Sequence, residues 1–548
     1  MTAGLGDADL VELARAWTAA DPHDGDRAEI EALIEAADLH ELGRRFAGPL
    51  TFGTAGLRGP LRAGPAGMNA AVVIRAAAGL ARYLLDEGHG GGTVVIGFDA
   101  RRRSDEFAST SAHVFAAMGF AVQLMPRPLP TPVLAFAVQH LGAVAGVMVT
   151  ASHNPPDDNG YKVYLGDGAQ LVPPADRRIE AAISAVGPAR EVVLAGGHGI
   201  LGEDVLTEYV AAVVRALDPE RVPAADRARL RVAYTALHGV GASTTRLTFA
   251  AAGFADPEPV AEQDEPDPRF PTVAFPNPEE PGAVDLLLDL AGRVGADVAI
   301  ALDPDADRCS VVCGGRQLTG DEVGALLADW LLRRGVRGTY ASSLVSGSLV
   351  HVIAAAHGVP SEETPTGFKW IARAGSADAP LVYGYEEALG YAVAPSVVRD
   401  KDGISAALAV ALLAAELKAT GRTVLDRLDE LAREHGLFVT GQLSVRVEDL
   451  TVISRAMERI RAVPPATLLG REVAFADLAL EEPPVDAVRL LGDGVRVIVR
   501  PSGTEPKLKA YLETVVPVHE DAGLIAARGR GEDELDQLRA EMSVALGL

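Results

Sequence analysis

The chain has 548 residues, 48% of them hydrophobic, and a formal net charge of -25. That length is too great for one hydrophobic core, so we expect several domains, each able to bury a core of its own. The acidic balance argues against nucleic acid and anionic membranes as main partners, and a site for a phosphorylated ligand would have to concentrate its cations locally.

The expected elements are helical at the start and then alternate. Residues 1–49 have apolar positions at helical spacing, which predicts an acidic helical extension packed on the first domain. From about residue 50, strand-like runs alternate with helical ones, and the pattern recurs twice; this indicates successive α/β domains built on largely parallel or mixed sheets. After about residue 435, alternating or apolar strands with fewer helices predict an α+β domain. The expected segments are 1–49, 50–205, 206–320, 321–435 and 436–548.

Cysteine content and hydropathy bear on the compartment. Cys309 and Cys313 are the only cysteines; their spacing fits no common zinc pattern, and we expect small core residues in a reducing compartment. No basic stretch followed by an apolar core opens the chain. The longest apolar run, 406–415, is about half of the roughly 20 residues that a membrane helix needs. We therefore expect a cytoplasmic protein without membrane partners.

The run TASHNPPDDNGYKVY begins at Thr150, directly after an apolar strand-like run. It places Ser152 at a strand end, with His153 beside it as a candidate proton acceptor. Nucleophilic or phosphoryl-carrier chemistry needs such a pair. Ser, Asn and Pro are also ordinary turn residues, so a polar turn after a buried strand is the plain alternative.

The segment LDPDADR places three aspartates, Asp303, Asp305 and Asp307, at the end of another apolar run. Alternate residues of an extended chain point to one side, so we expect their carboxylates to converge. Like charges at close range are costly without a cation, and oxygen-only ligands suit Mg²⁺. Arg308 would add a fixed cation for a phosphate or for the carboxylates. An acidic surface loop is the alternative.

Three further segments carry polar groups in tight loops. VRPSGTEPKLKAY combines a guanidinium, two hydroxyls and free backbone N–H groups, a set typical of a phosphate-binding loop. GYEEALGY offers two carboxylates that could bind sugar hydroxyls, and FGTAGLRG is a glycine-rich turn with an arginine. A long segment with many prolines, 256–282, is expected to wrap the surface near a site. The residues concerned in the first loop are Arg500, Ser502, Gly503 and Thr504.

In this order, the segments TASHNP, DPDADR, GYEEALGY and RPSGTEP resemble the α-D-phosphohexomutase superfamily of phosphoglucomutases and phosphomannomutases over residues 50–513. The resemblance implies four domains around a central cleft and one Mg²⁺ per chain. The family's phosphoserine falls on Ser152, which completes a metal site with the three aspartates. It also implies a phosphate-binding loop at Arg500, Ser502, Gly503 and Thr504. Basic residues that line the family's active site fall on Arg58, His153, Lys162, Arg308 and Lys369.

A finer likeness is to the phosphoglucomutase 2 / phosphopentomutase-like branch, carried by FGTAGLRG, DNGYKVY, LHGVG and DKDGISAA. Many hexose-specific members have a serine two positions after the first glutamate of the sugar loop. Here Glu386 is present, but Ala388 stands at that position. The loss of a hydroxyl contact should weaken discrimination of a hexose hydroxyl, which keeps pentose phosphates among the candidate substrates.

The expected reaction is a reversible shift of phosphate between C1 and the terminal hydroxyl of an aldose, glucose phosphate first among the candidates. It would pass through phosphorylated Ser152 and a bisphosphorylated sugar, which also serves as activator, in a monomer or dimer. His153 or Lys162 would move the hydroxyl proton. The alternatives are a mutase that acts on ribose, deoxyribose or mannose phosphate, a metal-dependent phosphatase that uses a phosphoserine, and a non-catalytic sugar-phosphate binding protein.

Overall fold

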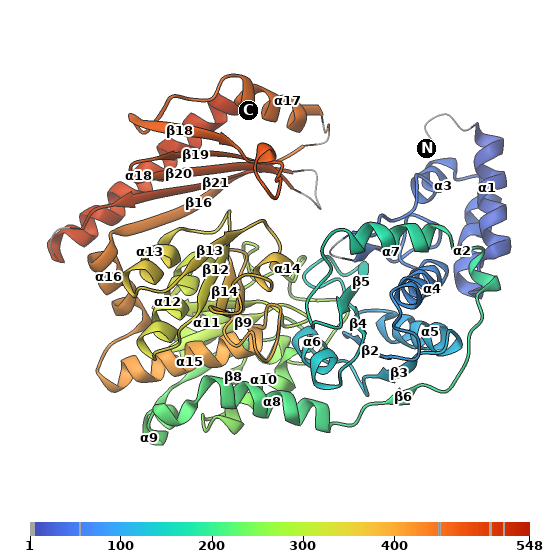
Figure 1. Ribbon diagram of the computed structural model, residues 1–548, viewed down its shortest axis with the longest axis horizontal. Coiled ribbons are helices and arrows are strands. Elements are labelled where there is room, and N and C mark those ends of the chain that lie inside the picture. The colour runs from blue at the N-terminus through green and yellow to red at the C-terminus, as the bar shows by residue number, and fades with distance from the viewer. Residues whose placement is uncertain (1–5, 54–55, 448, 450, 503–506, 519–520) are drawn as a thin grey trace. The chain divides into compact units, whose positions relative to one another are not determined.

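The computed structural model describes residues 6–53, 56–447, 449, 451–502, 507–518 and 521–548. The chain divides into two compact units. Unit 1 comprises Met1–Gln317 and Leu389–Glu416, and unit 2 comprises Leu318–Ala388 and Leu417–Leu548. Figure 1 labels the elements of both units.

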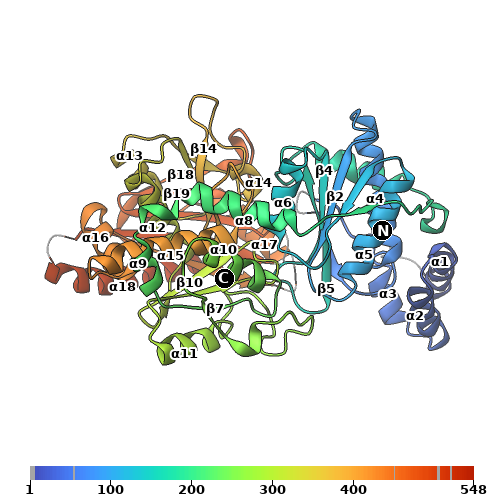
Figure 2. The ribbon, with the colours of Figure 1, turned by 90° about the horizontal axis from the view of Figure 1, so that it is seen from below.

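Three helices precede the first sheet of unit 1: α1 (Asp7–Ala20), α2 (Asp24–Glu35) and α3 (Leu39–Arg45). They bury one apolar face each, through Ala14, Ile30 and Leu42. Figure 2 shows α1, α2 and α3 together beside the first sheet and its helices.

The first sheet has the strand order β1-β5-β4-β2-β3-β6. Strands β4, β2 and β3 run parallel, whereas β5 is antiparallel to both β4 and β1. The sheet is therefore mixed rather than largely parallel, and the turn from β4 into β5 carries the serine loop. Its elements are β1 (Leu57–Pro60), α4 (Ala70–Asp86), β2 (Thr93–Phe98), α5 (Ser104–Ala117), β3 (Ala121–Leu124), α6 (Thr131–His140), β4 (Ala145–Val149), β5 (Asp158–Leu165), α7 (Ala175–Ser184), the 3-10 helix η1 (Ala189–Glu191) and β6 (Gly199–Ile200).

The second sheet of unit 1 has the order β11-β10-β9-β7-β8. Strand β9 is fully buried and ends at the aspartate cluster, and the antiparallel strand β10 returns from it. Cys309 and Cys313, at the two ends of β10, are free and buried, which confirms them as core residues. The elements of this part of unit 1 are α8 (Asp204–Leu217), η2 (Pro219–Arg221), α9 (Ala224–Arg229), β7 (Val232–Thr235), α10 (Gly241–Ala251), β8 (Glu258–Pro259), η3 (Ala261–Gln263), α11 (Asp285–Val294), β9 (Val298–Leu302), β10 (Cys309–Cys313) and β11 (Arg316–Gln317). The later segment of unit 1 adds β15 (Gly390–Ala392), which is not part of this sheet, and most of α15 (Gly403–Ala419).

Unit 2 begins with a parallel arrangement in which β12 pairs with both β13 and β14. The apolar helix α12 begins with a capping box in which the Thr319 and Glu322 side chains each accept from the other's backbone N–H. The elements are α12 (Gly320–Arg333), β12 (Thr339–Ser343), α13 (Leu349–Ala356), β13 (Ser361–Thr364), α14 (Phe368–Ile371), β14 (Leu381–Glu386) and α16 (Val424–His435).

The last sheet of unit 2 has the order β16-β21-β20-β19-β18-β17, and its pairings are antiparallel. Among the described residues, this part of the chain has fewer helices than each preceding α/β segment, as expected. Its 26-residue helix α18 shares a hydrophobic cluster with the sheet, which includes Leu535, Leu538, Val497 and Leu512. The elements are β16 (Leu437–Arg446), α17 (Thr451–Ala462), β17 (Thr467–Leu468), β18 (Arg471–Asp477), η4 (Leu478–Leu480), β19 (Val488–Gly492), β20 (Val495–Pro501), β21 (Lys507–Val516) and α18 (Asp521–Leu546).

Among the described residues, no single helix is long and apolar enough to cross a membrane, and the bent pair of α15 and α16 passes only when the two helices are taken together.

Candidate active site

Ser152 lies just beyond the C-terminal end of β4, is 2% exposed and has a left-handed φ of 52°. This conformation is uncommon for a residue with a side chain and needs support from its surroundings. Its N–H donates to Thr150 Oγ1 at 2.8 Å. Its hydroxyl donates to Asp303 Oδ2 at 2.8 Å. The serine is thus held with its oxygen turned toward the aspartate cluster.

Arg101 holds the backbone of the serine loop. This arginine is 4% exposed, and its guanidinium donates to the carbonyl oxygens of Ser152 at 2.7 Å and Asn154 at 2.6 Å. It also donates to the carbonyls of Pro155 at 2.8 Å and Asp158 at 3.2 Å. Four carbonyl groups of one turn therefore converge on a single cation.

Sequence reasoning did not select Arg101. A usable signal existed, because Arg101 follows β2, Ser152 follows β4, and the two strands are parallel neighbours. The carboxyl ends of parallel strands meet at one edge of a sheet, where α/β proteins build their sites.

The proline-rich segment 256–282 contributes two contacts here. The Arg101 guanidinium lies 4.9 Å from the centre of the Phe270 ring. Glu279 Oε2 accepts from Arg308 Nη1 at 3.0 Å. The segment lies near the site, as expected.

Asp303, Asp305 and Asp307 are fully buried, and one carboxylate oxygen from each lies within 4.8 Å of the others. The predicted convergence is confirmed, but its predicted cause is wrong. The chain after β9 is a tight turn rather than an extended strand, with Ala306 in a left-handed conformation at φ 56°. The turn, not strand alternation, brings the carboxylates together.

Lys162, on β5, neutralises two of these carboxylates. Its ammonium donates to Asp305 Oδ2 at 2.7 Å and to Asp307 Oδ2 at 2.8 Å. Burial alone would lower the pKa of Lys162, but the two carboxylates outweigh burial and raise it. Lys162 is therefore a firmly held cation in this arrangement.

The pKa values of the three carboxyl groups are shifted in different directions. Burial, followed by repulsion from Asp305 and Asp307, raises the pKa of Asp303 well above its ordinary value. Burial also acts to raise the pKa of Asp305 and Asp307, but Lys162 draws both below their ordinary values. Asp303 therefore takes up a proton more readily than Asp305 or Asp307.

The cluster keeps capacity for a cation. Asp305 Oδ1 and Asp307 Oδ1 are buried without a hydrogen-bond partner. Buried carboxylate oxygens are rarely left so, and hard divalent ions such as Mg²⁺ prefer oxygen ligands. The residues present therefore fit a divalent metal ion.

His153 and Arg58 border the serine. His153 Nδ1 is 3.2 Å from Ser152 Oγ, and burial together with Arg308 and Arg58 lowers the pKa of its imidazole well below 6.5. Arg58, on β1, places Nη1 3.5 Å from Asn154 Oδ1, and its Nε is buried without a partner. The neutral imidazole is suited to accept a proton.

In unit 2 the sugar-loop residues lie at the end of β14. Glu386 Oε1 accepts from the N–H of Gly367 at 2.8 Å. Gly367 directly precedes helix α14, which contains Lys369. This hydrogen bond joins the Glu386 loop to the loop that carries Lys369. Ala388, two residues after Glu386, presents a methyl group.

The second carboxylate of that loop has a different environment. Glu387 Oε2 accepts from the hydroxyls of Ser343 at 3.2 Å and Ser346 at 3.0 Å. The two carboxylates that the sequence offers for sugar hydroxyls thus have different hydrogen-bond partners.

The phosphate-loop candidates lie between β20 and β21. Arg500 stands opposite Lys509 in the strand register, and its positive charge opposes the rise that burial causes in the pKa of the Tyr511 hydroxyl. The N–H of Ser502 donates to the Lys507 carbonyl at 2.8 Å, which ties the two ends of the loop together. Two further candidates, Gly503 and Thr504, lie outside the described residues.

The candidates therefore fall into two groups, one in each unit. The group in unit 1 consists of Arg58, Ser152, His153, Lys162, Asp303, Asp305, Asp307 and Arg308, and the described group in unit 2 consists of Lys369, Glu386, Ala388, Arg500 and Ser502.

Comparisons with known proteins agree on one family. Models of the phosphoglucomutase/phosphomannomutase alpha/beta/alpha domains I, II and III match residues 49–189, 207–316 and 319–435, and the C-terminal domain model matches 443–527. The "Probable phosphomannomutase" of Haemophilus influenzae is 44% identical over 87% of this chain and 96% of its own. The phosphopentomutase of Mus musculus is 34% identical over 94% of this chain and 92% of its own.

A solved structure supports the same likeness. A protein from Thermus thermophilus described as a phosphomannomutase superposes with a TM-score of 0.71 at 28% identity, covering 88% of this chain and 99% of its own.

Proposed function

The chain belongs to the phosphoglucomutase/phosphomannomutase family of enzymes, which shift phosphate within a sugar, and we propose that Ser152 is the residue that carries the phosphoryl group. The observation behind this proposal is the 2.8 Å contact between Ser152 Oγ and Asp303 Oδ2 inside the buried aspartate cluster. A serine hydroxyl held against metal-type ligands suits phosphoryl transfer, which depends mainly on positioning and charge stabilisation.

We propose one Mg²⁺ per chain, held by Asp303, Asp305 and Asp307 with an oxygen on Ser152. When bound, the ion would neutralise charge on the transferring phosphoryl group. The unpartnered oxygens of Asp305 and Asp307 support this assignment.

Proton movement falls to His153 rather than Lys162. His153 is the neutral group beside Ser152 Oγ, whereas Lys162 is held protonated by two carboxylates. A general base must be unprotonated and within reach of the proton that it accepts. Lys162, Arg58 and Arg308 would instead supply fixed positive charge around the phosphoryl group.

The non-reacting end of the substrate is assigned to unit 2. Arg500 and Ser502, with Gly503 and Thr504 from the loop between β20 and β21, would bind the phosphate that is not being transferred. Glu386 and Lys369 would contact the sugar hydroxyls. A bisphosphorylated sugar is the proposed intermediate and activator, since phosphorylated Ser152 donates to one hydroxyl and then recovers the other phosphoryl group.

The substrate is an aldose phosphate whose phosphate moves between C1 and the terminal hydroxyl. We place glucose 1-phosphate first, with ribose or deoxyribose 1-phosphate and mannose 1-phosphate as the alternatives. The methyl group of Ala388 favours tolerance of pentoses, and the names of the mouse and Haemophilus relatives support pentose and mannose phosphates.

The domain boundaries 1–49, 50–205, 206–320, 321–435 and 436–548 are part of the same proposal, and the four matched family regions support them. We also propose that the enzyme acts in the cytoplasm as a monomer or dimer on small sugar phosphates, without nucleic-acid or membrane partners.

The decisive experiment compares the wild type with Ser152→Ala in the presence of Mg²⁺ and bisphosphorylated sugar. Glucose, mannose and ribose 1-phosphates are supplied, and both the isomerised sugar phosphate and free inorganic phosphate are measured. Ser111→Ala, which removes another buried hydroxyl of unit 1, is the matched control. Full turnover by Ser152→Ala would refute the carrier role, and release of inorganic phosphate in step with substrate loss would indicate a phosphatase.

A further inference from the structure

A cavity of about 220 Å³ lies in unit 1 between the end of helix α1, helix α4 and the segment that precedes η1. Its volume is below the roughly 300–1,000 Å³ of pockets for drug-sized ligands. It could hold about seven water molecules at their share of liquid volume, about 30 Å³ each, so it has room for a small organic molecule. The lining residues that matter here are Trp17, Asp21, Ala71, Arg75, Val186 and Pro188.

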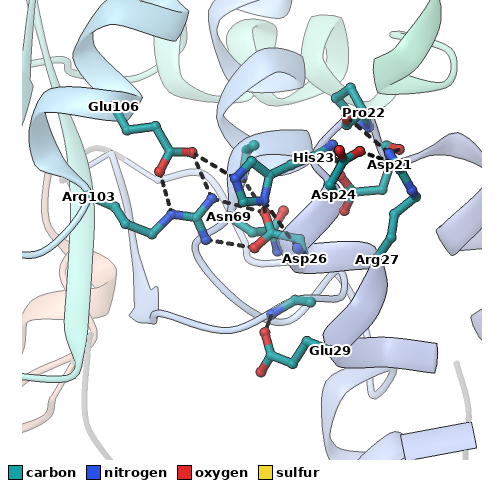
Figure 3. A network of polar contacts seen from close by, with 12 residues as sticks. Asp21, Pro22, His23, Asp24, Asp26, Arg27, Glu29, Asn69, Arg103 and Glu106 are labelled. Carbon is teal, nitrogen blue, oxygen red and sulfur yellow. Dashed lines mark hydrogen bonds and ion pairs between the residues drawn. The ribbon is translucent and has the colours of Figure 1, made fainter. Parts of the chain in front are cut away.

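One oxygen of the buried Asp21 carboxylate forms no well-aligned hydrogen bond. The residue is 1% exposed, and its Oδ1 accepts from the N–H of His23 at 2.9 Å. Its Oδ2 has no hydrogen-bond partner. Arg27 and Arg190 bind its main-chain carbonyl instead of the carboxylate, at 3.2 and 2.9 Å. Figure 3 shows Asp21 beside Arg27 at the border of the polar network of α2.

Arg75 supplies a donor that nothing uses. Its Nε is buried without a hydrogen-bond partner. Across the described part of the chain, Arg75 forms neither an ion pair nor a hydrogen bond. Burial therefore lowers the pKa of its guanidinium with no carboxylate to oppose the effect.

Asp21 and Arg75 do not neutralise each other, although both line the cavity. Burial raises the pKa of the Asp21 carboxyl; the nearby Trp17 indole is among the groups that oppose this rise, and Arg75 is not. Leaving a charged or polar group buried and unpaired costs free energy, so each group would gain from a partner of opposite charge. One ligand that carries both an anion and a cation would satisfy the two together.

We propose that this cavity binds a free α-amino acid with a compact apolar side chain, whose carboxylate pairs with Arg75 and whose ammonium pairs with Asp21. Ala71, Val186 and Pro188 form an apolar wall against which the side chain would pack.

Other ligand classes leave one of these groups unsatisfied. A phosphate or sugar phosphate would place two negative charges near the Asp21 carboxyl. A simple amine would leave the Arg75 guanidinium without an anion. A hydroxy acid matches the amino acid in shape and in its carboxylate, but offers Asp21 a neutral hydroxyl in place of a charge. This last class is therefore the sharpest comparison.

The test is titration calorimetry on the full chain with L-valine, its 2-hydroxy analogue and isobutylamine, which lacks the carboxylate. We expect L-valine to bind, and both analogues to bind at least about tenfold more weakly, because hydrogen bonds to charged groups contribute at least about a tenfold factor each. Asp21→Asn and Arg75→Gln should weaken L-valine binding by a similar factor.

Two further variants separate binding from folding. Ala71→Leu fills the cavity and should abolish binding, while Arg82→Gln removes an exposed arginine of the same helix and should leave binding unchanged. Circular dichroism and mutase turnover show that each variant is folded. Absence of L-valine binding at millimolar concentration, equal binding of the hydroxy analogue, or unchanged binding in Arg75→Gln and Asp21→Asn would each overturn the proposal.

Discussion

Arg101 Nη2 donates to the main-chain carbonyl of Ser152 at 2.7 Å. A buried cation therefore binds the backbone of the residue that is proposed to carry the phosphoryl group. The same guanidinium binds the carbonyls of Asn154, Pro155 and Asp158. Because Ser152 has a left-handed backbone, this support keeps it in a conformation that it would otherwise leave.

Arg101→Lys should therefore lower kcat while leaving KM for the sugar phosphate nearly unchanged. An ammonium cannot reproduce the fork of donors, and losing one or two charged hydrogen bonds at about 1.5 kcal/mol each corresponds to about a tenfold to hundredfold loss. Steady-state kinetics measure this. Arg102→Lys is the control, since Arg102 is 51% exposed and pairs with Asp157 at the surface. Equal losses in both variants would contradict a positioning role for Arg101.

Lys162 and a metal ion are expected to share the carboxylates of Asp305 and Asp307. In Lys162→Gln these two buried groups lose the cation that they share, and only Asp307 keeps a second one nearby, Lys401 at 3.5 Å. Breaking a buried pair typically costs about 3–5 kcal/mol. The variant should melt well below the wild type in chelator and regain more stability than the wild type when Mg²⁺ is added. Thermal unfolding with and without Mg²⁺ measures both effects.

Lys401→Gln provides the comparison for this experiment. Lys401 Nζ lies 3.5 Å from Asp307 and 3.7 Å from Asp400, so its loss should change the metal-free melting temperature less. If Lys162→Gln melts like the wild type in chelator, the lysine does not hold the carboxylates together.

The parts of the site that could be predicted are those encoded within a few residues. Ser152 at the end of a buried strand and three aspartates at the end of another are local patterns, and both lie where they were expected. The aspartates converge for another reason, because the turn through Ala306 depends on backbone geometry that alternation of residue types does not reveal.

Arg101 shows what a local pattern cannot contain. Its four carbonyl partners lie 51 to 57 residues further along the chain, and only the parallel pairing of β2 with β4 brings them within reach.

Asp26 is expected to hold the N-terminal helices onto the first sheet domain. Its carboxylate, 3% exposed, accepts from Arg103 at 2.7 and 3.0 Å and from the N–H of Ala70 at 3.2 Å, as Figure 3 shows for the arginine. Asp26→Asn should lower the free energy of unfolding by about 1.5–3 kcal/mol, because Arg103 loses one of its two carboxylate partners and keeps only Glu106. Chemical denaturation measures this.

Asp24→Asn is the matched change in the same helix. Asp24 pairs with Arg27, but its side chain is 90% exposed, and exposed pairs contribute little. We expect no measurable change in stability. A loss as large as that of Asp26→Asn would mean that helix capping, rather than the buried ion pair, is responsible.

Asp402 should make stability depend on pH. Its carboxyl caps α15 through the N–H groups of Ile404 and Ser405 and accepts from the Tyr209 hydroxyl, and burial raises its pKa above 3.8. The folded state then binds a proton more tightly than the unfolded state. Stability should fall as pH rises from 3.8 through the raised pKa, since over that range only the folded state retains the proton.

Asp402→Asn keeps a capping side chain but cannot ionise. Relative to the wild type, the variant should therefore gain stability as pH rises through that range. Melting temperatures of both proteins across a pH series give the difference. A wild type that becomes steadily more stable than Asp402→Asn as pH rises would contradict the raised pKa.

Ala388→Ser should shift selectivity toward hexoses. A hydroxyl at this position restores one polar contact near Glu386, and a hydrogen bond worth about 1–1.5 kcal/mol corresponds to roughly a tenfold change. The ratio of kcat/KM for glucose 1-phosphate to that for ribose 1-phosphate measures the effect. Ala377→Ser places the same hydroxyl at an exposed position of unit 2 and should leave the ratio unchanged. If Ala388→Ser leaves the ratio unchanged as well, the hydroxyl at this position does not govern discrimination between hexose and pentose phosphates, and selectivity must come from other contacts to the sugar.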